Sequence, residues 1–152
     1  MSTPSTTAPA PSVTPAPRAP FRHKTVAGLL AFFFGWAGAH WWYLGRRLPW
    51  LPITFSIIVL TVSLYQTAPL GSQLGYYLFL IPLSAGFIEA VVLCLRSDEK
   101  FDATYNRGHD RKSANGWSAA ILAALFLFFG MAAFMGHVVM FSLAMNDGSL
   151  GF

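Results

Sequence analysis

Few residues of this chain are of types that do chemistry, and they lie far apart. Glu89 is an acid inside a long apolar stretch. A carboxylate there is typical of a proton or cation site, or of a hydrogen-bonded group that holds helices together. His40 could bind a metal or carry protons, but a lone histidine near an interface commonly joins packed helices. We favour the structural role for both membrane-embedded polar candidates.

The remaining histidines and the single cysteine indicate no active centre. His137 has the same interpretation as His40, while His23 and His109 should be solvated. Cys94 lies in an apolar run and excludes an internal disulfide framework. The sequence has no His-x-x-x-His or Cys-x-x-Cys spacing, phosphate loop or nucleophile elbow. We therefore expect no enzyme activity, no catalytic residues, no metal and no cofactor.

The composition favours a lipid environment. Hydrophobic residues make up 55% of the 152 residues and charged residues 11%, whereas soluble domains carry roughly a quarter charged residues. A soluble chain this small could not hide so much apolar surface. The net charge of +4 comes from bases that flank apolar runs, which indicates anionic headgroups and not nucleic acid.

Four apolar runs suggest helices, and their lengths match or exceed the roughly 20 residues that cross a membrane. They are Thr25–Gly45, Leu48–Gln66, Leu74–Leu95 and Trp117–Met145. None shows the strict alternation of a membrane β-barrel. The expected fold is an all-α, polytopic helical membrane protein with three to four membrane helices and the lipid bilayer as its first partner.

Two segments are polar. Residues 1–20 hold six of the ten prolines among Ser, Thr and Ala, so this N-terminal tail should be disordered. Arg96–Gly116 carries five bases and four acids. That nearly neutral mixture suits a solvated connector or a short helix at the headgroups.

The most informative stretch is GWAGAHWWYLGRR, Gly35–Arg47. Its small residues allow close helix packing or a helix break, and its aromatic residues followed by two arginines are typical of a lipid–water boundary.

This stretch resembles the two-transmembrane-helix ("TM-two") domain family, as found in bacteria. The matching motif residues are Gly35, Gly38, His40, Tyr43, Leu44 and Gly45. Trp41-Trp42 departs from the family's usual Arg-Phe pair, and Ile88-Glu89 corresponds to its acidic step. The resemblance covers residues 22–107, with residues 117–145 as an additional transmembrane helix. It implies two spanning helices and no particular activity.

Charge placement leaves two topologies open. If all four runs cross the membrane, the ten bases are divided three against seven between its sides. If Thr25–Gly45 instead enters and returns at Gly35–Gly38, all ten lie on the cytoplasmic side. The glycines permit this re-entrant hairpin, whereas the length of the run permits a full crossing.

The expected function is a membrane scaffold or interaction role, in the cytoplasmic (inner) membrane of a bacterium. Small residues four apart could support self-association or contact with other membrane proteins, or could pack within one monomer: Ala119 with Ala123, Ala120 with Ala124, and Ala132 with Gly136. The alternative is a small transporter or channel subunit that uses Glu89 as its proton- or cation-coupling group.

Overall fold

The computed structural model describes residues 19–65, 67 and 73–146. Most of the predicted tail, residues 1–18, lies outside these ranges, as do residues 68–72 between the second and third apolar runs. The regular elements of the described ranges are all helical, which confirms the all-α class. Their bounds are α1 Lys24–Phe34, η1 Gly35–Ala37, α2 Ala39–Leu44, α3 Leu51–Leu64, α4 Leu74–Leu95, α5 Asp98–Tyr105 and α6 Gly116–Asn146.

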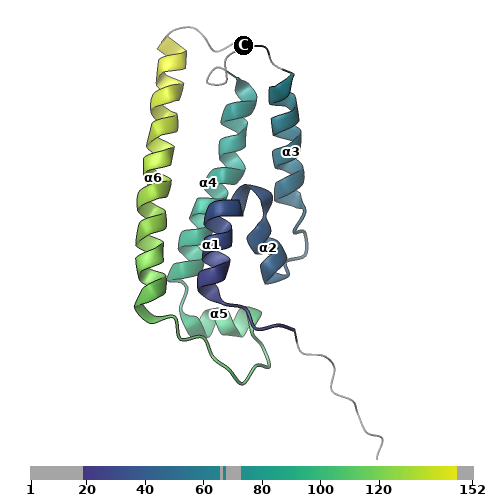
Figure 1. Cartoon of the computed structure of the whole chain (residues 1–152), viewed down its shortest axis with the longest axis vertical. Coiled ribbons are helices and arrows are strands. Elements are labelled where there is room, and N and C mark those ends of the chain that lie inside the picture. Colours follow the sequence, from purple (N-terminus) through teal and green to yellow (C-terminus); the bar gives the residue numbers. More distant parts are fainter. Residues whose placement is uncertain (1–18, 66, 68–72, 147–152) are drawn as a thin grey trace, which may run out of the picture.

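The first apolar run is a hairpin and not one helix. α1 ends at Phe34, η1 turns the chain, and α2 runs back beside α1 (Figure 1). Both ends of the run lie beside α5, because Lys24 donates to Asp98 and Arg46 lies close to Tyr105. The structure therefore has the hairpin form of this run, with a break in the helix at Gly35–Gly38.

Three helices reach the end of the molecule opposite α5: α3, α4 and α6 (Figure 1). α4 has 22 residues and α6 has 31, and both are long and apolar enough to cross a membrane. α3 has only 14 residues, about 21 Å, so the prediction of a near-spanning helix over Leu48–Gln66 was too long. The chain uses residues 45–50 to leave the hairpin before α3 begins, with proline in its first turn.

α4 is the central helix, with α1, α3 and α6 packed around it. Small residues line this contact, since Ala27, Ala31 and Ala90 are completely buried. They allow close backbone approach, which is the main way helices pack in lipid. Cys94 is also buried in this core. The large apolar side chains of α3 and α6 point outward, as expected for lipid-facing surfaces.

Of the two alternatives for the polar loop, a solvated connector or a short helix, the structure has a short helix, α5, over part of the loop. Ser97 caps it by accepting a hydrogen bond from the Lys100 amide, and Asp98 and Glu99 occupy its first turn. Phe101 is fully buried beneath the hairpin and α4 core. α5 is therefore fixed to the membrane helices by an apolar anchor.

Candidate functional site

The hairpin turn depends on two glycines. A Cβ on Gly35 would lie 2.4 Å from the Cα of Gly86 in α4, so only hydrogen atoms fit between these backbones. Gly38 has φ +68°, a left-handed conformation that strongly favours glycine. Together they bend the chain and seat the bend against α4.

The Tyr-Leu-Gly step closes the other end of the hairpin. The Tyr43 hydroxyl accepts a hydrogen bond from the His23 amide at 2.7 Å, which ties α2 to the start of α1. Leu44 is buried. Gly45 ends α2 with φ +68°, a left-handed helix cap.

Three side chains from α2 and the residues just after it contact the Glu89 carboxylate. His40 Nε2 lies 2.5 Å from Oε2, and Trp41 Nε1 donates to the same oxygen at 3.0 Å. Arg46 donates to Oε1 at 3.0 Å. Both carboxylate oxygens are therefore engaged, and the contact fixes α2 on α4.

His40 is 2% exposed, the most enclosed member of this cluster. Its Nδ1 is buried with no hydrogen-bond partner among the described residues. A proton on that nitrogen would have nowhere to donate, which is costly in a buried site. The ring therefore makes its hydrogen bond to Glu89 through Nε2 alone.

Arg46 brings a guanidinium group to the carboxylate from just beyond the end of α2. Its Cζ lies 5.0 Å from the centre of the Trp41 ring, so arginine and indole approach Glu89 together. Burial alone would lower the pKa of Arg46, but the charge of Glu89 and hydrogen bonds to Glu89 and Tyr105 raise it above its usual value. The arginine therefore stays charged beside the carboxylate.

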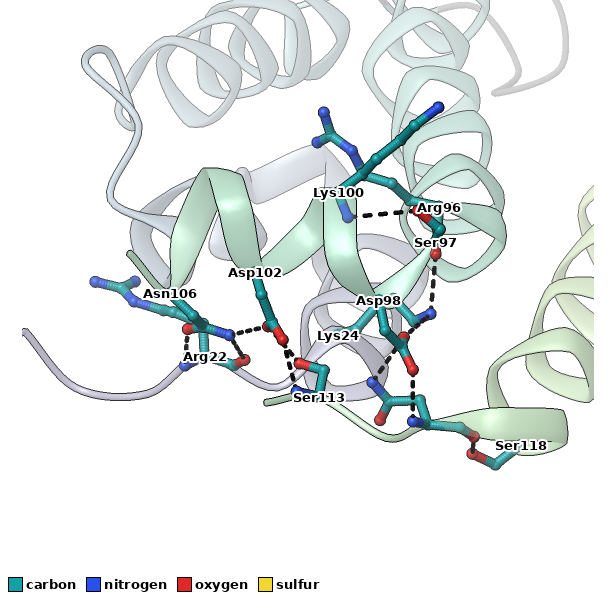
Figure 2. Close-up of polar contacts among 11 residues, drawn as sticks. Arg22, Lys24, Arg96, Ser97, Asp98, Lys100, Asp102, Asn106, Ser113 and Ser118 are labelled. Atoms are coloured by element: carbon teal, nitrogen blue, oxygen red, sulfur yellow. Dashed lines mark hydrogen bonds and ion pairs between the residues drawn. The ribbon is translucent and has the colours of Figure 1, made fainter. Parts of the chain in front are cut away.

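A second polar cluster joins α5 to the start of α1 and the segment before α6 (Figure 2). Lys24 is 4% exposed, and its ammonium donates to the Asp98 carboxylate and to the Arg96 carbonyl. Asp98 also accepts from the Asn115 amide at 2.9 Å. Burial alone would raise the pKa of Asp98, but these hydrogen bonds lower it.

The same cluster continues one helical turn along α5. Asp102 accepts from the Ser113 amide and hydroxyl, both at 2.6 Å, and from Asn106 at 2.7 Å. Asn106 in turn pairs with the backbone of Arg22 through both its amide atoms. These bonds lower the pKa of Asp102 against the opposing effect of burial.

The other histidines lie apart from Glu89. His137 bonds to the Ala133 carbonyl in its own helix and stacks on Tyr76. His23 and His109 are half-buried, and both make edge contacts with Phe21. These two rings are therefore partly exposed, and Phe21 covers one edge of each.

Neither cluster matches a metal centre or a substrate pathway. Across the described ranges no three His, Cys, Asp or Glu side chains are grouped to hold a metal. α4 remains helical past Pro82 and Gly86, whereas transport sites typically lie at broken helices. The one break that lies beside α4 is the hairpin turn, and backbone atoms fill that contact.

Comparison with known proteins decides the family. A family model described as "TM2 domain" matches residues 20–67. The uncharacterized membrane protein YozV of Bacillus subtilis (strain 168) is 35% identical over 88 residues, covering 56% of this chain and 82% of that protein. The chain belongs to the TM2 domain family. No solved structure matches it.

The TM2 match spans the hairpin and α3, and ends before α4. The family model does not extend to residue 107, so the predicted domain limit there stays a prediction. The family resemblance implies two spanning helices. The first apolar run of the matched residues is a hairpin, so the two spanning helices are not both within the matched residues. Glu89 lies outside the match, yet it binds three of the residues within it.

Proposed function

We propose that this TM2 protein is a small, non-enzymatic membrane scaffold in the cytoplasmic membrane of a bacterium. The bacterial relative supports that setting. The proposed scaffold has a rigid part, formed by the hairpin on α4, and a contact surface, formed by the outward face of α6.

The observation that carries this proposal is the full engagement of Glu89. Its two oxygens take hydrogen bonds from His40, Trp41 and Arg46. A carboxylate with three donors is preorganised for holding helices and would have to lose partners to bind a cation. This favours the structural role of Glu89.

α6 is the helix best suited to reach another protein. Among the described helices it packs on α4 and more lightly on α1, and most of its surface faces outward. One small-residue pair, Ala119 with Ala123, is buried inside the monomer, whereas Ala120 and Ala124 are exposed. The exposed pair leaves a close approach open for another helix.

Photo-crosslinking in native membranes tests the scaffold role. A crosslinking residue at Ala124 should give a discrete protein adduct, whereas one at Ile58, exposed on α3, should give mainly lipid adducts. Lipid adducts alone at both positions would contradict an α6 contact surface.

Reconstituted vesicles test the alternative role, which is transport of protons or cations. Vesicles with the wild-type protein should show the same proton and cation flux as empty vesicles. A flux that is present and disappears in Glu89→Gln would replace the scaffold proposal with transport.

A further inference from the structure

Three arginines from separate segments gather around two tyrosines at the α5 end of the molecule. Arg22 precedes α1, Arg46 follows α2, and Arg96 ends α4. We refer to these three side chains as the arginine cluster. All three are half-buried, so their guanidinium groups are held in place more firmly than surface bases.

Arg22 lies next to Tyr43 and Gly45 at the end of α2. Arg22 Cζ lies 5.6 Å from the centre of the Tyr43 ring, and a Cβ on Gly45 would lie 3.4 Å from its Nη2. Arg22 therefore reaches the residue immediately before Arg46.

Tyr105 joins the other two members. It lies close enough to Arg46 to raise the pKa of that arginine, and the Arg96 Cζ lies 5.9 Å from the centre of its ring. Tyr43 and Tyr105 both pack against the same apolar core. Each of the three arginines therefore lies beside one of these two tyrosines, around the base of the hairpin and α5.

In the part of the chain that the structure describes, two members of the arginine cluster have no carboxylate partner, although the loop sequence is nearly neutral. Asp98 and Asp102 are engaged on one side of α5, and Figure 2 shows the Arg96 and Lys100 side chains directed to its other side. Within the described ranges, Glu89 is the one carboxylate that pairs with a cluster member. Arg22 and Arg96 therefore have no carboxylate partner among the described residues.

The depth of the cluster indicates which anion it meets. Trp42 and Trp50 flank Arg46 in the sequence and are 60% and 53% exposed. Exposed tryptophans beside arginines are typical of the headgroup region of a bilayer. Guanidinium groups match phosphate oxygens in a two-pronged geometry, and basic pockets between membrane helices bind anionic lipid headgroups.

We infer that the arginine cluster is a binding site for the phosphodiester headgroup of an anionic phospholipid. The tyrosine rings form its apolar floor, and Arg22 and Arg96 contribute the charges that Glu89 leaves unpaired. The site does not depend on the scaffold role, because it lies on the hairpin, the end of α4 and α5, away from the outward face of α6.

The test uses the full chain, purified in detergent and stripped of lipid. Phosphatidylglycerol and phosphatidylcholine with identical acyl chains are titrated separately, and bound lipid is counted by native mass spectrometry. Phosphatidylglycerol should bind, and the Arg22→Gln/Arg96→Gln pair should weaken it at least about tenfold. The matched control, Arg107→Gln/Lys112→Gln, removes the same charge from exposed positions and should change affinity less than about twofold.

Three outcomes would overturn the inference. Equal losses in both pairs would indicate diffuse attraction without a site. Equal binding of the two lipids would remove the role of the anionic headgroup. Displacement of phosphatidylglycerol by millimolar inorganic phosphate would indicate a site for a soluble anion.

A conservative pair keeps the test decisive if the glutamine pair does not fold. Arg22→Lys/Arg96→Lys preserves charge and loses the two-pronged geometry. Phosphatidylglycerol affinity should then fall severalfold, and unchanged affinity would contradict a guanidinium site.

Discussion

At the scale of single residues, Glu89 and the hairpin glycines determine how the hairpin packs on α4. Glu89 accepts from three donors, one of them the buried His40. Gly35 and Gly86 meet backbone to backbone. The first contact is polar and the second steric, and both hold the hairpin on α4.

Replacing Glu89 separates its hydrogen bonding from its charge. Glu89→Gln keeps an acceptor and should lower the free energy of unfolding by about 1 kcal/mol. Glu89→Leu leaves Arg46, Trp41 and His40 without an acceptor and should cost about 2 kcal/mol or more. Thermal unfolding in detergent measures both, with Ile88→Leu on the exposed side of α4 as control. Equal midpoints for the Gln and Leu variants would contradict the structural role.

Gly35→Ala tests the backbone contact. The added methyl would meet Gly86 Cα at 2.4 Å, and the forced separation of hairpin and α4 should cost about 1–3 kcal/mol. Gly136→Ala is the matched control, since nothing lies within 4 Å of its Cβ position. Its unfolding free energy should stay within about 1 kcal/mol of wild type. Equal changes in unfolding free energy for Gly35→Ala and Gly136→Ala would contradict a close contact between Gly35 and Gly86.

At the scale of elements, α5 acts as a brace between the start of α1 and the segment before α6. Phe101 anchors it in the core, while Asp98 and Asp102 bind residues far away in sequence. The nearly neutral loop was compatible with either a solvated connector or a short surface helix. The pairing of Lys24 with Asp98 across 74 residues left no signal in the sequence, because many base–acid pairs were equally compatible with the composition.

The brace should respond to acid. The pKa values of Asp98 and Asp102 are lowered in the fold, so their contribution to stability is complete above the ordinary aspartate pKa of about 3.9 and is lost as the pH falls below it. The thermal midpoint should therefore drop between about pH 4 and pH 2. Asp98→Asn/Asp102→Asn should be less stable at pH 7 and show a shallower drop. Parallel pH profiles for the two proteins would exclude this linkage.

At the scale of the whole molecule, composition and apolar runs predicted a helical membrane protein, and charge counting favoured the hairpin as one of two topologies. The partners of Glu89 were not predictable, because they depend on how α2 turns back onto a helix more than 40 residues later. His40 was named as a helix-packing residue on general grounds. Trp41 and Arg46 were assigned to the lipid boundary, since aromatic and basic residues in that position usually lie there.

The central claim is that residues 24–46 enter the membrane region and return to the same side. Single cysteines at Ala19, Arg47, Lys112 and Thr67, all exposed positions, can be labelled in intact membranes of a Cys94→Ala protein with an impermeant thiol reagent. Ala19, Arg47 and Lys112 should react from one face, and Thr67 should react from the other. Labelling of Ala19 and Arg47 from opposite faces would show that the run crosses the membrane and would contradict the hairpin.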